Sequence, residues 1–144
     1  MGPNVWIVVA AILAGVAVIM TKGTTTRARS GSFFAFANAI AHAEGYGVPG
    51  AIPTVRNNPG DLKLGGDAIT TFATPADGWE ALYRQLDRIQ TGNTAYYQPT
   101  MTIGQVARVW TATEQTIWTN NVLASMREQG FAVNADTIIG DVLS

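Results

Sequence analysis

The pattern of apolar and polar residues divides the chain into three parts. Residues 5 to 20 (VWIVVAAILAGVAVIM) carry no charge, residues 21 to 32 are polar and rich in Thr, Ser and Gly, and the remainder alternates apolar stripes with polar loops. As a helix, an apolar run of about sixteen residues is about 24 Å long. The pattern predicts a transmembrane helix over residues 1 to 21, with Trp6 as an interfacial anchor, and a flexible linker over residues 22 to 32. One domain is expected over residues 33 to 144.

Other interpretations of the N-terminal segment stay open. A cleaved signal peptide would need a basic region before the apolar run and a small-residue cleavage site after it, and the sequence has no clear example of either. A buried helix, apolar on every face, would need a larger core than this chain can build. The cations Lys22, Arg27 and Arg29 favour a cytoplasmic location for the C-terminal side in a cell membrane. An internal membrane of a virus, or a weak signal-anchor whose orientation changes, would relieve that constraint.

Apolar periodicity predicts a mostly helical domain. The apolar stripe of Trp79, Leu82, Leu86 and Ile89 is the most regular one. The turn residues Gly-Gly-Asp between two short β-prone pieces predict a small β-hairpin within residues 62 to 74, which makes the expected fold class α+β. Helices are expected at residues 33 to 44, 75 to 91, 102 to 110, 114 to 129 and 136 to 143.

Composition narrows the chemistry that this domain can perform. The chain has no Cys and one His, which argues against thiolate chemistry and against most zinc sites, so no metal or cofactor is expected. Three of the 9 basic residues lie before residue 31, so the rest of the chain has 6 basic and 10 acidic residues, a net charge of −4. Nucleic acid is therefore not expected as a partner. Catalysis would have to depend on carboxyl and hydroxyl groups.

Glu44 is the strongest candidate for a catalytic group. It follows an apolar, aromatic-rich helix and directly precedes residues 45 to 61, a loop with four Gly and three Pro residues and too many helix breakers for a regular element. Such a position can desolvate a carboxyl group and raise its pKa, as a general acid of glycoside cleavage requires. An ordinary solvated glutamate at a helix end is the alternative.

Four segments of the domain together resemble phage-encoded lysozyme-like domains of the lytic transglycosylase branch. The resemblance covers about residues 34 to 142, and its most specific parts are the helix-ending AEG and the following NNPGDL. The segments are AIAHAEGYG, RNNPGDLK, FATPADGWEALYRQL and MTIGQVARVWTATEQTIWTNNVL. The resemblance implies a lysozyme-like fold and a muralytic enzyme of the virion-associated type.

By this resemblance Glu44 matches the catalytic glutamate of the family. It would act as the acid that cleaves the bond between N-acetylmuramic acid and N-acetylglucosamine. In a transglycosylase the same residue would then act as the base that yields a 1,6-anhydro product. A hydrolase would instead activate water, for which Asp61 is the nearest acidic candidate, although the matching family position is commonly Asn. Asp67, in the expected turn, is a weaker candidate, because the role of a solvated turn residue explains it better than a catalytic role.

The candidate substrate contacts all follow Glu44 in the sequence. Asn57 and Asn58 can hydrogen-bond N-acetyl or hydroxyl groups of a sugar, although they can equally shape the turn before Pro59. Asp61 and Tyr97 complete the expected binding set, with Tyr96 as the alternative to Tyr97. Trp79 and Trp110 lie on apolar stripes and are expected in the core, and His42 is left outside the site.

The function expected from the sequence is the cleavage of peptidoglycan glycan strands by a single-pass membrane protein. Either a transglycosylase or a muramidase fits, acting from a virion internal membrane or a bacterial inner membrane during genome delivery or host lysis. An endolysin released from a weak membrane helix would use the same chemistry at another time. A non-catalytic structural or peptidoglycan-binding protein of a virion is the alternative from a different class.

Overall fold

The computed structural model describes residues 18 to 21 and 24 to 144, and helices make up most of its regular structure. The longest helices are α1 (Gly31–Ala43), α3 (Pro75–Thr91) and α5 (Gln115–Glu128). Three shorter helices complete the domain: α2 (Ile52–Val55), α4 (Ile103–Trp110) and α6 (Ile139–Leu143). The mostly helical character expected from the sequence is confirmed.

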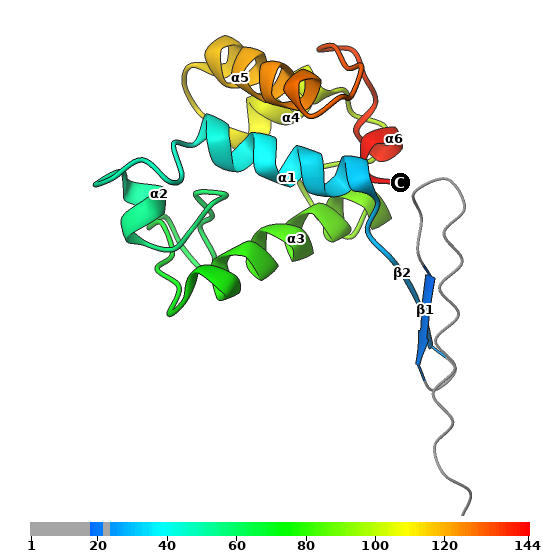
Figure 1. The fold of residues 1–144 in the computed structure, drawn as a ribbon, viewed down its shortest axis with the longest axis horizontal. Helices are drawn as coiled ribbons and strands as arrows, with labels where there is room; N and C mark the ends of the chain where they lie inside the picture. Colours follow the sequence, from blue (N-terminus) through cyan, green and yellow to red (C-terminus); the bar gives the residue numbers. More distant parts are fainter. Residues whose placement is uncertain (1–17, 22–23) are drawn as a thin grey trace, which may run out of the picture.

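Helix α1 forms the centre of the domain. It packs against α5 on one side and α3 on the other, α4 packs against α5, and α6 contacts both α1 and α3 (Figure 1). The apolar faces of these helices share one core, in which Phe36, Leu86 and Met126 have no exposed surface. This arrangement leaves the C-terminal end of α1 free to meet the loop that follows it.

Local capping explains where the long helices begin. The hydroxyl oxygen of Ser30 accepts a hydrogen bond from the backbone N–H of Phe33 at 3.1 Å, so α1 starts two residues before the expected position. Thr74 caps α3 in the same way, and Thr102 and Gln105 form a reciprocal capping box on α4. Helices α3 and α4 therefore lie where the sequence pattern places them.

Two expectations about loops are wrong. Residues 62 to 74 were expected to form a β-hairpin, but no strand occurs in that range: the segment turns back through a hydrogen bond from Thr70 N–H to the Leu62 carbonyl, with no further ladder. The loop 45 to 61 was expected to lack regular structure, yet it contains the single turn α2. Pro53 is tolerated there because the first turn of a helix needs no backbone donor.

The segment before α1 differs from the expected helix and linker. The expected transmembrane helix over residues 1 to 21 lies outside the described residues except for its last four. Those four form β1 (Val18–Thr21), which pairs antiparallel with β2 (Thr24–Arg27). The run of threonines in β2 suits a strand, because β-branched residues fit extended backbone. Of the helices in the described part of the chain, none is both long and apolar enough to cross a bilayer.

Arg29, expected in the linker, belongs to the folded domain. Its guanidinium donates hydrogen bonds to Glu80 and Asp87 of α3, the shortest at 2.8 Å to Asp87. The same group lies over the rings of Phe33 and Tyr83, at 5.5 and 5.1 Å from their centroids. These contacts fasten the chain before α1 to α3, so the domain extends at least to residue 29.

Candidate active site

A cleft of about 410 Å³ lies at the C-terminal end of α1. Segments far apart in the sequence line it: Glu44 after α1, the loop from Gly60 to Leu64, Gln85 of α3, Tyr97, and the end of α4 around Trp110. The cleft thus exists only because α1, α3 and α4 pack together in the way described above.

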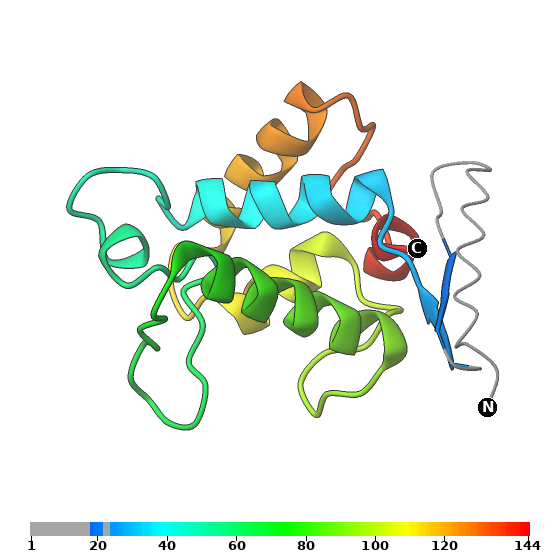
Figure 2. The same ribbon diagram turned by 60° about the horizontal axis from the view of Figure 1, so that its bottom comes forward.

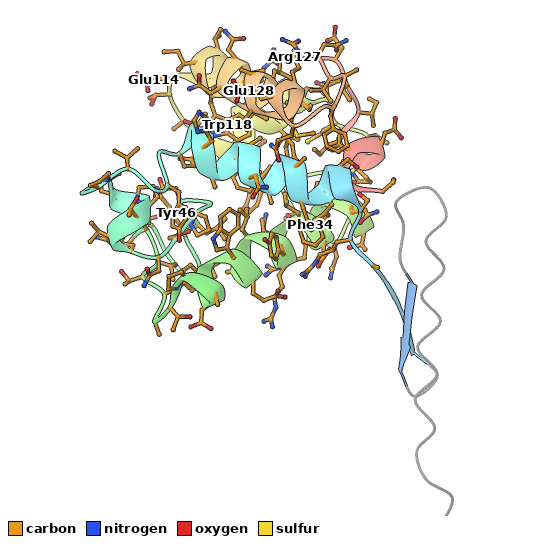
Figure 3. The ribbon with its side chains drawn as sticks, in the orientation of Figure 1. Phe34, Tyr46, Glu114, Trp118, Arg127 and Glu128 are labelled. Atoms are coloured by element: carbon orange, nitrogen blue, oxygen red, sulfur yellow. The ribbon has the colours of Figure 1, made fainter. Side chains whose placement is uncertain are left out.

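Glu44 is held firmly at this position. Its backbone N–H donates to the Ile40 carbonyl at 2.9 Å, which continues the helical hydrogen bonding of α1 by one residue. Its carboxylate oxygen Oε1 accepts a hydrogen bond from the indole Nε1 of Trp118 at 2.8 Å. Trp118 belongs to α5, and Figure 3 shows its ring between that helix and the end of α1. Backbone and side chain of Glu44 are therefore both fixed.

Glu44 is half-buried, and its environment favours the protonated form. Burial raises the pKa of Glu44 to about 7, the hydrogen bond from Trp118 opposes that rise, and the charge of Asp61 adds to it. A carboxyl group with this pKa is substantially protonated near neutral pH, and a small change of environment lets it lose the proton. Glu44 therefore has the properties of a general acid that can also act as a base.

Three aromatic rings form a row beside Glu44. The indole rings of Trp110 and Trp118 stack with centroids 6.0 Å apart, and the ring of Tyr97 lies 5.9 Å from that of Trp110. Trp110 also donates from Nε1 to the carbonyl of Gly60 at 3.2 Å, which ties α4 to the loop across the cleft. Trp110 was expected in the core; it packs against the core and also lines the cleft.

Asp61 is the second carboxyl group in the cleft. Its backbone has a left-handed φ of 50°, and its oxygen Oδ1 is buried without a hydrogen-bond partner among the described residues. Burial raises the pKa of Asp61, while the nearby charges of Lys63 and Arg56 lower it. A buried acceptor without a partner carries an energetic cost, which a hydrogen-bond donor such as a water molecule would remove.

Asn57 and Asn58 do not line the cleft, and this favours the turn-shaping alternative. Asn58 is fully buried: its amide nitrogen donates to the carbonyls of Leu62 and Thr70, both at 2.9 Å, and its amide oxygen accepts from Leu62 N–H at 2.8 Å. The amide of Asn57 donates to the carbonyl of Phe72 at 3.1 Å. These hydrogen bonds hold together the loop that carries Asp61, so both asparagines stabilise the wall of the cleft without lining it.

The two neighbouring tyrosines differ in burial and in position relative to the cleft. Tyr97 is 8 % exposed, belongs to the core and lines the cleft, and burial raises its pKa to about 12. Tyr96 is 75 % exposed and lies outside this cleft. Asp67 and His42 are both exposed and do not line it either.

Trp118 and Gln85 are the site residues that sequence reasoning missed. Trp118 is 74 residues from its hydrogen-bond partner Glu44 along the chain. Nothing in the apolar pattern of α5 distinguished it from a core tryptophan. Gln85 is a half-buried polar residue of α3 that lines the cleft. The available signal in the sequence was its position outside the apolar stripe of that helix.

Comparisons of the chain with protein-family models, with curated proteins and with solved structures find no match. Within the described residues there is also no group of three or more acidic, His or Cys side chains that could hold a metal ion.

Proposed function

We propose that residues 29 to 144 are a lysozyme-like domain that cleaves peptidoglycan glycan strands, with Glu44 as the catalytic acid. The observation that carries this proposal is a single carboxyl group with a pKa of about 7, held by Trp118 at the wall of a cleft of about 410 Å³. A cleft of this volume accommodates sugar units, and its aromatic and hydroxyl-bearing lining suits their faces and edges.

The chemistry begins with protonation of the leaving group. Glu44 donates its proton to the oxygen between C1 of N-acetylmuramic acid and C4 of N-acetylglucosamine, and the C1–O bond breaks as positive charge develops at C1. The departing sugar leaves with a neutral 4-hydroxyl group, and Glu44 becomes a carboxylate. The hydrogen bond from Trp118 stabilises that carboxylate, so the same contact that keeps the acid in place supports its ionised state.

Two outcomes complete the reaction. In a transglycosylase the Glu44 carboxylate removes the proton of the muramic 6-hydroxyl, whose oxygen bonds to C1 and forms the 1,6-anhydro product. In a muramidase a water molecule attacks C1 and gives up its proton to a carboxylate. Asp61 lines the same cleft, but the resembled family commonly has Asn at the matching position, so a second carboxylate is not required by the resemblance. This favours the transglycosylase, in which one residue serves both steps.

The uncharged apolar run that precedes β1 completes the proposal with a membrane anchor. A protein of this type would be carried in a virion internal membrane or a bacterial inner membrane and would open the wall close to its anchor, during genome delivery or host lysis. The proposed partners are peptidoglycan strands and the membrane.

The test compares the protein with its Glu44→Gln variant on purified peptidoglycan, with released fragments analysed by mass spectrometry. We expect anhydromuramyl ends from the unaltered chain and a loss of at least about a thousandfold in rate from the variant. Reducing ends would indicate a muramidase. A folded chain that binds the wall and releases nothing would favour the alternative, a non-catalytic peptidoglycan-binding protein.

A further inference from the structure

A second cavity extends the cleft away from Glu44. It has a volume of about 620 Å³ and shares Lys63, Leu64 and Gln85 with the first cavity, so the two adjoin. The loop after α2 and the loop after α3 form its walls, and both loops project from the same side of α3 in Figure 2. Together the cavities make one elongated depression.

The charge of the depression changes along its length. The part near the end of α1 contains the carboxyl groups of Glu44 and Asp61. The second cavity is lined by the cations Lys63 and Arg88 and by no acidic residue. We call this second cavity the cationic groove. It stands out because the chain from residue 31 onward has 6 basic and 10 acidic residues.

The cations of the groove are available to a ligand. Lys63 and Arg88 are both exposed, and neither forms an ion pair with the described residues. By contrast, Arg84, one turn before Arg88 on α3, donates to Glu80 at 3.3 Å. Unpaired cations that share a concave surface attract anions, whereas cations paired within a helix contribute less to the local potential.

The other lining residues suit a peptide or sugar chain. Tyr96, which is 75 % exposed, presents its ring at the edge of the groove, and the side chains of Asn93 and Thr94 add hydrogen-bonding groups. An exposed aromatic ring beside two cations is a setting for an anionic ligand with an apolar portion. A glycan strand without peptides carries only the lactyl carboxylate of each muramic acid, which stays next to the sugar ring. A stem peptide carries additional carboxylates farther from the glycan.

We propose that the cationic groove binds the carboxylate groups of a peptidoglycan stem peptide while the glycan lies in the cleft at Glu44. This inference rests on the proposed function, since it assigns the substrate of the same site. Muramic acid carries its peptide on the lactyl group, so a strand in the elongated depression brings peptide carboxylates alongside the glycan. Lys63 and Arg88 would make the protein prefer strands that carry peptides over strands that lack them.

The experiment measures binding, so that it does not depend on cleavage. The full chain with Glu44→Gln, in a non-ionic detergent, is titrated with soluble glycan strands that carry stem peptides and with strands whose peptides have been removed. The comparison adds Lys63→Gln together with Arg88→Gln. Arg108→Gln is the matched control, because Arg108 is an exposed arginine outside both cavities.

We expect the double substitution to raise the Kd for peptide-bearing strands about three- to tenfold, the range for two exposed ion pairs, and to leave the Kd for peptide-free strands unchanged. Arg108→Gln should change neither value. Lys63→Arg with Arg88→Lys keeps both charges and should retain the preference. High ionic strength should abolish the preference in the unsubstituted groove.

Equal weakening toward both kinds of strand, no weakening toward either, or an absence of binding in the folded Glu44→Gln chain would overturn the inference. The outcome is separable from that of the proposed function. A protein that prefers peptide-bearing strands but never cleaves them would refute the enzyme and retain the groove, and an enzyme without the preference would do the reverse.

Discussion

The elevated pKa of Glu44 makes a prediction about stability that is independent of any enzymatic activity. A carboxyl group whose pKa is higher in the folded than in the unfolded state binds its proton more tightly when folded. The protein is therefore most stable below the unfolded pKa and loses stability as the pH rises through the folded pKa. For Glu44 that interval runs from the usual value of 4.5 to about 7. Replacing Glu44 by Gln removes the titrating group and retains an oxygen that can accept from Trp118.

The size of the effect follows from the interval. At about 1.4 kcal/mol per pH unit, the range between 4.5 and 7 corresponds to about 3 kcal/mol. Solvent still reaches part of the carboxyl group and screens it, so we expect about 2 kcal/mol. Above about pH 8, the free energy of unfolding of the Glu44→Gln variant should therefore exceed that of the unaltered domain by about 2 kcal/mol. Below about pH 4 Glu44 is protonated in both the folded and the unfolded state. Its ionisation then no longer contributes to the difference in unfolding free energy between variant and unaltered domain.

The assay is urea unfolding of residues 28 to 144 followed by tryptophan fluorescence, repeated across this pH range for both proteins. The informative quantity is the pH dependence of the difference in unfolding free energy, because constant effects of the substitution cancel. A difference that stays flat with pH, or that falls as the pH rises, would refute the desolvated-carboxyl argument and remove the main support for Glu44 as an acid.

Two further predictions concern the hydrogen bond from Trp118 to Glu44 and the ion pairs of Arg29. Trp118→Phe removes the hydrogen-bond donor that lowers the pKa of Glu44. The basic limb of the pH–rate profile for peptidoglycan cleavage should therefore shift to higher pH by about one unit. A basic limb at the same pH would mean that this hydrogen bond does not affect the pKa of the catalytic group. Arg29→Met removes the ion pairs to α3 and should lower the free energy of unfolding by about 1 kcal/mol without changing the cleavage rate, as measured by denaturant midpoints and initial rates. An unchanged midpoint would place residue 29 outside the folded unit.

Local signals in the sequence were sufficient for most of the helices and for one catalytic candidate. The apolar stripe through Leu82 and Leu86 and the capping residues Thr74 and Thr102 act within a few residues, so they specify α3 and α4 without reference to the rest of the chain. The apolar helix directly before Glu44 and the glycine directly after it made this residue a candidate, but only the resemblance of AEG and NNPGDL to lytic transglycosylases favoured it over a solvated glutamate at a helix end.

Features that depend on segments meeting in space were decided only by the tertiary structure. Trp118 is a donor to Glu44 because α5 packs on α1, and no property of α5 alone reveals that contact. Gly78 illustrates the same point: a Cβ there would overlap the backbone oxygen of Asn57, so its small size is required by a loop about twenty residues away. Asn58 likewise became a buried loop support because the chain folds back to Thr70. Periodicity and capping act along the chain, whereas burial and hydrogen bonding between distant segments arise only after the core has formed.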